Sequence, residues 1–474
     1  MLSINDILFA LIGSTCKDSQ LTITETVIDS RKVIPGALFI ALKGERVDGH
    51  NFVNKAFDNG ALVAIIEKDI TTHHKIVDLS TNHFSTDEID FPDPPFCLKV
   101  QKSLKALQTM AHYWRRKLNI RVISITGSVG KSSTKELVAE VLSKKYRTHK
   151  NPGNYNNEIG LPLTILSLGK GQERLVLEMG FYYTGEITFL CDIALPQVGV
   201  LTNVGTVHAE RAGSQEKIAK GKAELVQALP SAPDGTAILN FDDPLIRPMA
   251  KMTKAKVIFY GLSPEADLWA DGIKGNGLKG IQFILHYKNK QIQLQVPLLG
   301  RHSVQTVLRA VAVSLVEGLS WEEIEQGLNQ GHTQLRLIAV KTKSGALILD
   351  DTYNATPEST IAALDLLQEL EGQKIAVLGD MLELGQYEHQ AHQLVGRRAA
   401  EVVQHLIAVG PRGKTIAETA REAGLAPTAI TWVESANDAT ELLQYNLEEG
   451  DVVLIKGSHG LRMDRISSVL EEVP

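Results

Sequence analysis

The chain has 474 residues, about three times the length of a typical domain, so we expect two to four domains. Its hydrophobic fraction of 43% and charged fraction of 22% are ordinary for a soluble globular protein. The formal net charge of −6 argues against nucleic acid or an anionic membrane as the main partner. Three widely separated cysteines (Cys16, Cys97 and Cys191) exclude a disulfide framework and a Cys-rich zinc module.

No segment of the sequence predicts export or membrane insertion. The N-terminus carries Asp6 and has neither Lys nor Arg before its first apolar stretch, which argues against a signal peptide. No window approaches the roughly 18 uninterrupted apolar residues that a membrane-spanning helix needs. We therefore expect a cytoplasmic protein whose thiols are reduced.

Short apolar runs alternate with turns in the first hundred residues. The runs at 27–31, 37–42 and 61–67 predict strands of a small α/β domain. A polar, Pro-bearing stretch at 85–96 predicts a linker or surface loop. Apolar residues three and four apart over 103–118 predict a helix that leads into the next domain.

From about residue 120, short runs rich in Val, Ile and Leu alternate with helical patterns. This alternation predicts βαβ units on a mainly parallel sheet. Its expected strands lie at 121–126, 174–179, 197–204, 236–240 and 256–260. An alternating stretch from Asp267 to Leu299 predicts antiparallel strands added to that sheet, and a helix is expected at 303–316.

A second alternating series starts near Leu335 and is long enough for a separate α/β domain. Its expected strands lie at 346–351, 374–381, 405–410, 429–433 and 451–457. The fold class predicted is therefore α/β, with domains at 1–100, 101–333 and 334–474.

The strand expected at 121–126 runs directly into TGSVGKSST and then into a helical pattern. Strand, Gly-rich turn, Lys-Ser and helix form the arrangement that binds the phosphates of a nucleotide. Gly127 and Gly130 let backbone N–H groups point at the anion, and Lys131 reaches the β- and γ-phosphates. The hydroxyl of Ser132 would then ligate Mg²⁺.

The match is to a short form of this loop. The eight-residue form has Gly five positions before Gly130, where this chain has Ile125. The alternative is a Gly-rich turn with an exposed Lys, and the flanking strand and helix favour nucleotide binding over it.

Polar residues follow the next two expected strands. Glu178 ends the strand LVLE, where a phosphate-loop protein needs a carboxylate for Mg²⁺, although a solvent-facing Glu is the alternative. Thr202, Asn203, His208 and Glu210 come after the following strand, at the edge where open α/β sheets bind ligands. His208 is as consistent with a structural role as with a ligand.

Residues 151–164 form an Asn-rich segment, with four Asn and two Gly in its first ten residues. This composition excludes the interior of a helix or strand. The segment is either a plain surface loop or one that supplies amide groups to a polar substrate.

Together these segments resemble the Mur ligase family, the ATP-dependent amide ligases of peptidoglycan precursor synthesis. The similarity covers nearly the whole chain. It rests on VIDSRKVIPGALFIALKGERVDGHNFVNKAFDNGA near the N-terminus, on TGSVGKSST, GNYNNEIG, LEMG, TNVGTVHAE and GRH in the centre, and on DDTYNATPES, VLGDMLELG and LIKGS towards the C-terminus. The N-terminal and DDTYN segments are similar to the branch that joins D-alanyl-D-alanine to UDP-N-acetylmuramoyl-tripeptide.

The resemblance implies one domain for the UDP-linked substrate, a central ATPase and a C-terminal Rossmann-like domain that closes over the site. The implied contacts to ATP are Gly127, Ser128, Gly130, Lys131, Ser132, Ser133, Asn154, Asn157, His302, Arg336 and Asp351. The implied ligands of Mg²⁺ are Ser132, Glu178, His208 and Lys222. The implied catalytic residues are Lys131, Glu178, His208, Lys222 and Arg336.

The resemblance also implies two sets of substrate contacts. Those to the UDP-muramoyl end are Ser30, Arg31, Lys43, Gly44, Asp48 and His50. Those to the incoming dipeptide are Tyr353, Asn354, Lys456 and Ser458, with His459 as a further candidate.

Lys222 follows His208 by fourteen residues, the spacing at which several family members carry a carbamylated lysine. By itself, a lysine on this helix is more simply interpreted as a solvated surface charge. Arg336 matches the arginine that approaches the ATP phosphates on closure.

The chain departs from the family pattern at a few positions. Ser303 and Thr306 stand where the family usually has Asn, and the first of these commonly contacts adenine. Thr356 also replaces Asn, and Tyr182 and Tyr183 replace an Arg-Gly pair. None of these changes removes a phosphate or metal group, so we expect activity with altered detail.

The implied reaction activates a substrate carboxylate as an acyl phosphate, which the amine of the dipeptide then attacks. The expected partners are small molecules, and we expect a monomer. Three alternatives stay open: a family ligase that adds a single amino acid, a phosphate-loop ATPase switch without ligase activity, and a non-catalytic nucleotide-binding scaffold.

Overall fold

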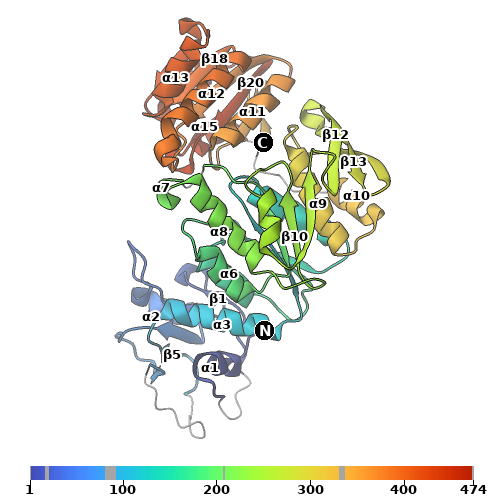
Figure 1. Cartoon of the computed structure of the whole chain (residues 1–474). Helices are drawn as coiled ribbons and strands as arrows, with labels where there is room; N and C mark the ends of the chain where they lie inside the picture. The colour runs from blue at the N-terminus through green and yellow to red at the C-terminus, as the bar shows by residue number, and fades with distance from the viewer. Residues whose placement is uncertain (1, 16–20, 81–91, 207–208, 330–336, 472–474) are drawn as a thin grey trace. The chain divides into compact units, whose positions relative to one another are not determined.

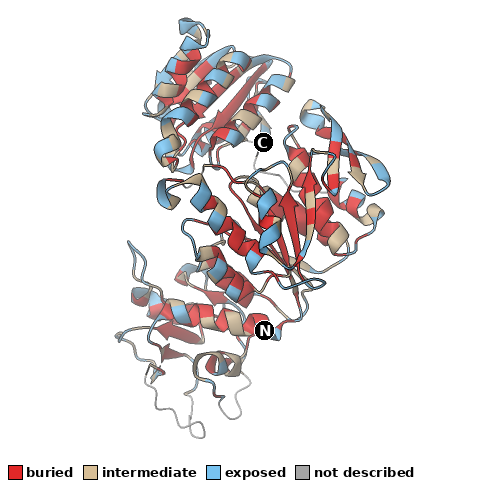
Figure 2. Cartoon of the chain, in the orientation of Figure 1, coloured by how far each residue is buried: buried red, intermediate tan, exposed pale blue. Residues whose placement is uncertain are grey.

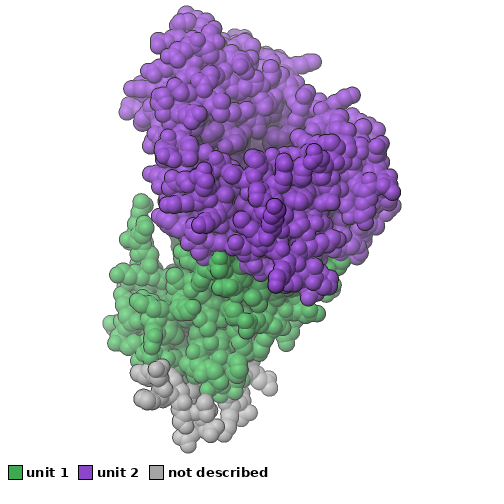
Figure 3. All heavy atoms as spheres, viewed as in Figure 1, with its two compact units in different colours: residues 1–124, 146–180, 186–197 green, residues 125–145, 181–185, 198–474 purple. Residues whose placement is uncertain are grey.

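The computed structural model describes residues 2–15, 21–80, 92–206, 209–329 and 337–471 (Figure 1). The chain divides into two compact units (Figure 3). Unit 1 consists of residues 1–124, 146–180 and 186–197, and unit 2 of residues 125–145, 181–185 and 198–474. None of the helices that the structure describes is long and apolar enough to span a membrane.

Unit 1 contains a five-stranded sheet in the order β1-β2-β3-β5-β4, with parallel pairing throughout. Its strands are β1 (Thr26–Val27), β2 (Leu38–Ile40), β3 (Val63–Ile66), β4 (Ile76–Asp78) and β5 (Phe96–Lys99). The strands expected at 37–42 and 61–67 are confirmed as β2 and β3, whose residues are all buried, as expected for uninterrupted apolar runs.

The prediction for 27–31 is wrong in extent. The strand ends at Val27, and Ser30–Lys32 form a 3-10 helix because the Asp29 carboxylate accepts a hydrogen bond from the Arg31 backbone N–H. In the predicted linker, residues 85–91 lie outside the described residues, and Phe96 opens β5.

The helices of unit 1 are α1 (Ile4–Ile12), α2 (Val53–Asp58), α3 (Ser103–Lys117), α5 (Gly160–Leu166) and α6 (Glu186–Ala194). α3 confirms the helix expected at 103–118. Two further strands of unit 1, β7 (Thr148–Lys150) and β8 (Arg174–Glu178), pair in parallel. β6 (Arg121–Thr126) contains the boundary at which the chain passes into unit 2.

The first part of unit 2 contains six strands in the order β14-β13-β12-β11-β10-β9. They are β9 (Val198–Leu201), β10 (Thr236–Asn240), β11 (Lys256–Gly261), β12 (Leu268–Gly275), β13 (Ile281–Tyr287) and β14 (Lys290–Val296). Pairing is parallel from β9 to β12 and antiparallel from β12 to β14, which confirms the predicted change of direction.

The helices that accompany these strands are α4 (Lys131–Leu142), α7 (Ala209–Ala212), α8 (Gln215–Gln227), α9 (Ser303–Val316) and α10 (Trp321–Asn329). α9 confirms the helix expected at 303–316 and is buried along most of its length. Figure 2 shows β10 as part of the buried interior.

The second part of unit 2 has a sheet in the order β15-β16-β20-β17-β18-β19. Its strands are β15 (Ile338–Lys341), β16 (Leu347–Asp351), β17 (Gln373–Gly379), β18 (His405–Val409), β19 (Ile430–Val433) and β20 (Asp451–Lys456). β15 is an antiparallel edge strand, and all other pairs are parallel.

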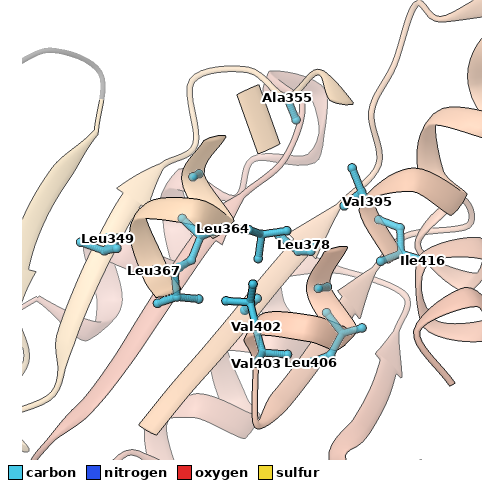
Figure 4. Close-up of a cluster of buried hydrophobic side chains, with 14 of the residues drawn as sticks. Leu349, Ala355, Leu364, Leu367, Leu378, Val395, Val402, Val403, Leu406 and Ile416 are labelled. Carbon is cyan, nitrogen blue, oxygen red and sulfur yellow. The ribbon is translucent and has the colours of Figure 1, made fainter. Parts of the chain in front are cut away.

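Five helices accompany this sheet: α11 (Pro357–Glu369), α12 (Glu388–Val402), α13 (Gly413–Glu422), α14 (Ala436–Asn446) and α15 (Asp464–Leu470). One apolar cluster joins the sheet to α11, α12 and α13, and a second joins it to α14 and α15. Figure 4 shows Leu364, Leu378 and Val402 of the first cluster turned toward one another. Helices therefore cover both faces, which suits a mainly parallel sheet.

Short 3-10 helices join these elements in the described ranges: Ser30–Lys32, Gly49–Phe52, Arg247–Met252, Gly277–Lys279, Gly385–Tyr387, Pro427–Ala429 and His459–Leu461.

Candidate active site

The turn between β6 and α4 has the geometry of a phosphate-binding loop. Gly127 approaches β9 so closely that a Cβ atom on it would lie 1.8 Å from Thr202 Oγ1. Gly130 has φ +84° and is the N-cap residue of α4. Both positions exclude larger side chains, and the second directs the chain into a helix whose N-terminus favours an anion.

Hydrogen bonds to Asn203, the residue that follows Thr202, fix the loop. The carbonyl of Asn203 accepts a hydrogen bond from Ser128 N (2.9 Å), and its side-chain Oδ1 accepts one from Val129 N (2.9 Å). The same amide donates to the Val129 carbonyl (3.3 Å), and Ser128 Oγ accepts from Gly205 N (2.8 Å). Asn203 therefore holds the loop, a role that the sequence did not reveal.

The Lys131 side chain turns back onto the loop that precedes it. Its Nζ donates to the carbonyls of Gly127 (2.8 Å) and Ser128 (3.1 Å). Ser132 and Ser133 lie partly buried in the first turn of α4. The ammonium group, the two hydroxyls and the helix N-terminus form an arrangement suited to phosphate oxygens.

Lys222 is buried on α8 and is 1% exposed, so the interpretation as a solvated surface charge is wrong. Its Nζ lies 5.1 Å from the centre of the Phe181 ring. Burial, together with repulsion from Lys131, lowers the pKa of Lys222 well below its ordinary value. Two other predicted groups, His208 and Arg336, lie outside the described residues.

Glu178 in unit 1 does not face solvent, because it is 3% exposed at the end of β8. Its Oε1 accepts a hydrogen bond from Asn156 Nδ2 (2.9 Å), and its backbone N donates to Asn151 Oδ1 (2.9 Å). The Asn-rich segment therefore positions the carboxylate, which a plain surface loop would not do. Asn156 was missed because the sequence does not show which Asn turns inward.

The two asparagines that were predicted in this segment behave differently. Both are exposed, but within the described ranges only the Asn157 side chain forms a hydrogen bond: its Oδ1 accepts from Gly160 N (2.9 Å) and Ile159 N (3.2 Å) at the start of α5. Their contact with a nucleotide stays a prediction.

Hydroxyl and carboxylate oxygens are the donors that Mg²⁺ prefers, so Ser132 and Glu178 fit this ion. Within the described ranges, no group of three His, Cys, Asp or Glu side chains is placed to hold a metal. The predicted His208 falls outside those ranges.

The two positions where the family usually has Asn use their hydroxyls within the protein. Ser303 Oγ donates to the Leu299 carbonyl (2.6 Å), and Thr306 Oγ1 accepts from Arg309 Nη2 (2.9 Å). Nearby His302 is at the start of α9. Because position 303 is Ser, α9 lacks the side-chain amide that the family usually has there.

In the C-terminal part of unit 2, Lys456 holds the segment after β16. Its Nζ donates to Asp351 Oδ2 (2.5 Å) and to the carbonyl of Asn354 (3.0 Å), and Lys456 is 2% exposed. Tyr353, between these partners, is exposed. Thr356 replaces the family Asn as a cap, because its Oγ1 accepts from Ser359 N at the start of α11.

The two further predicted dipeptide contacts, and the two tyrosines that replace an Arg-Gly pair, differ in how far they are exposed. Ser458 is buried, and its Oγ accepts from Leu382 N (2.9 Å), whereas His459 is exposed. Tyr182 and Tyr183 are also exposed, and the Arg211 guanidinium lies 4.4 Å from the Tyr182 ring centre.

In unit 1, the side chains of Asp48 and His50 form a hydrogen bond with each other. The Nδ1 of His50 lies 2.6 Å from Asp48 Oδ1, and Nε2 accepts from Glu67 N (3.0 Å). Lys68 donates to the second Asp48 oxygen, and this bond holds the pKa of Asp48 well below its usual range. Both ring nitrogens of His50 are engaged, so the ring fixes the loop rather than presenting a free donor.

The remaining predicted contacts to the UDP-linked substrate surround this loop. The backbones of Lys43 and Asp48 pair in an isolated antiparallel β-bridge, and Gly44 N donates to the Val47 carbonyl (2.9 Å). Ser30 is buried, and the exposed Arg31 pairs with Asp29. Their substrate roles stay predictions.

The chain aligns from end to end with known ligases. The UDP-N-acetylmuramoyl-tripeptide–D-alanyl-D-alanine ligase of Bacillus subtilis (strain 168) is 34% identical over 462 residues, which are 96% of this chain and 94% of that one. The chain belongs to the Mur ligase family. Models of three of its domains match: the Mur ligase family catalytic domain at residues 22–115, the middle domain at 125–314 and the glutamate ligase domain at 335–459.

Solved structures of Mur ligases share this fold. MurF from Acinetobacter baumannii has a TM-score of 0.83 and 31% identity, with 99% of this chain and 98% of that chain covered. The MurF ligase of Thermotoga maritima in complex with ADP has a TM-score of 0.79 and 28% identity, with 95% and 98% covered. The predicted α/β fold class is confirmed, whereas the domain boundaries at 100 and 333 stay predictions.

The contact between Gly127 and Thr202 predicts that Gly127→Ala weakens ADP binding tenfold or more, because the new Cβ displaces the loop. A strained backbone position costs about 1–3 kcal/mol, and tenfold in affinity corresponds to about 1.4 kcal/mol. Calorimetric titration with ADP measures the effect. Gly171→Ala is the control, since no atom lies within 4 Å of its added Cβ; equal affinities for the two variants would contradict the prediction.

The lowered pKa of Lys222 predicts a neutral amine at a pH where an exposed lysine is charged. Only the neutral form can add CO₂, so we expect one carbamate signal in a ¹³C NMR spectrum recorded with labelled bicarbonate near pH 8. The signal should vanish in Lys222→Met and persist in Lys220→Met, an exposed position on the same helix. A signal that survives in Lys222→Met would refute the assignment.

Proposed function

We propose that the chain is an ATP-dependent ligase that joins D-alanyl-D-alanine to UDP-N-acetylmuramoyl-tripeptide and releases ADP and phosphate. The observation that carries this proposal is an intact phosphate loop in a chain that aligns with the Bacillus ligase over 96% of its own length. The ADP complex of the Thermotoga relative supports nucleotide binding by the same fold. The product is a peptidoglycan precursor for the cell wall.

The loop performs the first half of the reaction. A carboxylate oxygen of the tripeptide attacks the γ-phosphorus of ATP, the bond to the β,γ-bridging oxygen breaks, and ADP leaves. Lys131 moves from the loop carbonyls to the phosphate oxygens, and the N-terminus of α4 faces the charge that develops there. The hydrogen bonds from the loop N–H groups to Asn203 keep the loop in place during this transfer.

The second half forms the amide. The amine of D-alanyl-D-alanine attacks the acyl carbon, the C–N bond forms, and phosphate leaves as the nitrogen loses its proton. Tyr353 and Asn354 are the proposed dipeptide contacts, and Lys456 keeps their segment in position. Arg336 is the proposed cation for the phosphates on closure, which also excludes water from the acyl phosphate.

When bound, Mg²⁺ neutralises charge on the phosphates. Ser132 and Glu178 would hold it, together with His208 and a carbamylated Lys222. The Asn156 amide orients the Glu178 carboxylate for this purpose.

The substrates also indicate where the enzyme works. ATP and a UDP-linked precursor are cytoplasmic metabolites, so we place the enzyme in the cytoplasm. We propose that it acts as a monomer, since the residues assigned to both substrates come from one chain.

Phosphate release from ATP and Mg²⁺ should require both UDP-N-acetylmuramoyl-tripeptide and D-alanyl-D-alanine. A coupled phosphate assay with each omitted in turn measures this, and mass spectrometry should show the pentapeptide product. Lys131→Ala should lower the rate by about 100-fold or more, as expected for loss of a cation on the transferred group. Lys220→Ala is the matched control on an exposed lysine.

Equal turnover without either substrate would favour an ATPase switch. Turnover with a single amino acid in place of the dipeptide would favour another ligase of the family. Either result would overturn the proposed function.

A further inference from the structure

One buried arginine lies beside the phosphate loop and has no part in the reaction described above. Arg309 is in the middle of α9 and is 4% exposed. Its Nη2 lies 3.1 Å from the position that a Cβ on Gly130 would occupy. The guanidinium is therefore packed against the residue that opens α4.

Three hydrogen bonds fix this guanidinium. Nε donates to Thr134 Oγ1 (2.8 Å), Nη1 to the Tyr260 hydroxyl (3.2 Å) and Nη2 to Thr306 Oγ1 (2.9 Å). All three acceptors are neutral, and no carboxylate pairs with Arg309 among the residues that the structure describes. An arginine stays charged inside a protein, and a buried charge without an anion is costly.

Its surroundings add to that cost. The guanidinium lies at the N-terminal end of α4, which carries partial positive charge, and Lys131 is the next residue after Gly130. Cations are stabilised at the other end of a helix. An anion bound at the loop would therefore stabilise the guanidinium.

Arg115 shows the ordinary solution for a buried arginine. It is also 4% exposed, but it donates to the carbonyls of Ala194 (2.6 Å) and Leu118 (3.3 Å), at the C-terminal ends of α6 and α3. Those ends carry partial negative charge, which compensates the guanidinium. Arg309 lacks this compensation.

The same bonds connect both sides of the loop. Thr134 Oγ1, which accepts from Arg309, donates to the Gly130 carbonyl (2.6 Å). The Tyr260 hydroxyl, which also accepts from Arg309, lies within hydrogen-bond distance of the Thr202 carbonyl (3.0 Å). Arg309 thus joins the start of α4 to the end of β9, against which Gly127 packs.

We propose that Arg309 is a positioning residue of the phosphate loop and a fixed positive charge whose counter-ion is the bound polyphosphate. Thr306, which stands where the family usually has Asn, then has a function of its own, because its hydroxyl accepts a hydrogen bond from this guanidinium. The inference rests on the proposed use of a nucleotide by the loop, and it is independent of the peptide substrates.

Competition of ADP and adenosine against a fluorescent ADP analogue, in the presence of Mg²⁺, tests the proposal in the full chain. Arg309→Met should raise the Kd for ADP tenfold or more and leave that for adenosine within twofold, because adenosine carries no phosphate. Arg309→Lys keeps the charge and should recover part of the loss. Arg115→Met, the matched control, should lower thermal stability without changing the ratio of the two Kd values.

An Arg309→Met chain that binds ADP within twofold of the native value would overturn the proposal. So would equal weakening of ADP and adenosine, which is the signature of general damage to the site. If Arg309→Met does not fold, Arg309→Gln provides the same comparison. A native chain that fails to bind ADP would instead refute nucleotide use by the loop, so the two failures are distinguishable.

Discussion

The close approach of the turn after β6 to the end of β9 is the constraint on which the site depends. Gly127 leaves no room for a side chain beside Thr202, and Asn203 accepts from the next two backbone N–H groups through its carbonyl and its side-chain oxygen. These contacts shape the loop before any ligand binds. Because the donors are already oriented, nucleotide binding need not order the loop, and reorganisation does not oppose phosphoryl transfer.

Two cationic side chains of unit 2 lie close to this loop. Lys131 lies on the loop carbonyls, and the Arg309 guanidinium packs against Gly130. In water such groups would repel one another weakly, but burial strengthens the repulsion. A bound polyphosphate turns this repulsion into attraction between the cations and the ligand.

The sequence predicted much of the fold because local patterns determine it. Short runs rich in Val, Ile and Leu predicted the bounds of β6 and β10, and the helix expected at 303–316 is α9. The prediction of a strand over 27–31 is wrong in extent because the Asp29 carboxylate accepts a hydrogen bond from the Arg31 backbone N–H, and the chain turns there.

The site was only partly predictable, because its supports come from residues far apart in the sequence. Glu178 was expected at a strand end, but Asn156, which orients it, was indistinguishable from its neighbouring asparagines. Arg309 gave no signal, since its partner Thr134 is 175 residues away. Conversely, Lys222 was open to interpretation as a surface charge until its burial was known.

In the proposed mechanism, the tripeptide carboxylate is activated as an acyl phosphate on this loop. Labelling both oxygens of that carboxylate with ¹⁸O tests it directly, because one oxygen must leave with the phosphate and the other must stay in the amide. Mass spectrometry of the released phosphate should show one ¹⁸O atom for each amide formed. Unlabelled phosphate would mean that water, and not the substrate, received the phosphoryl group, and the acyl-phosphate mechanism would then be wrong.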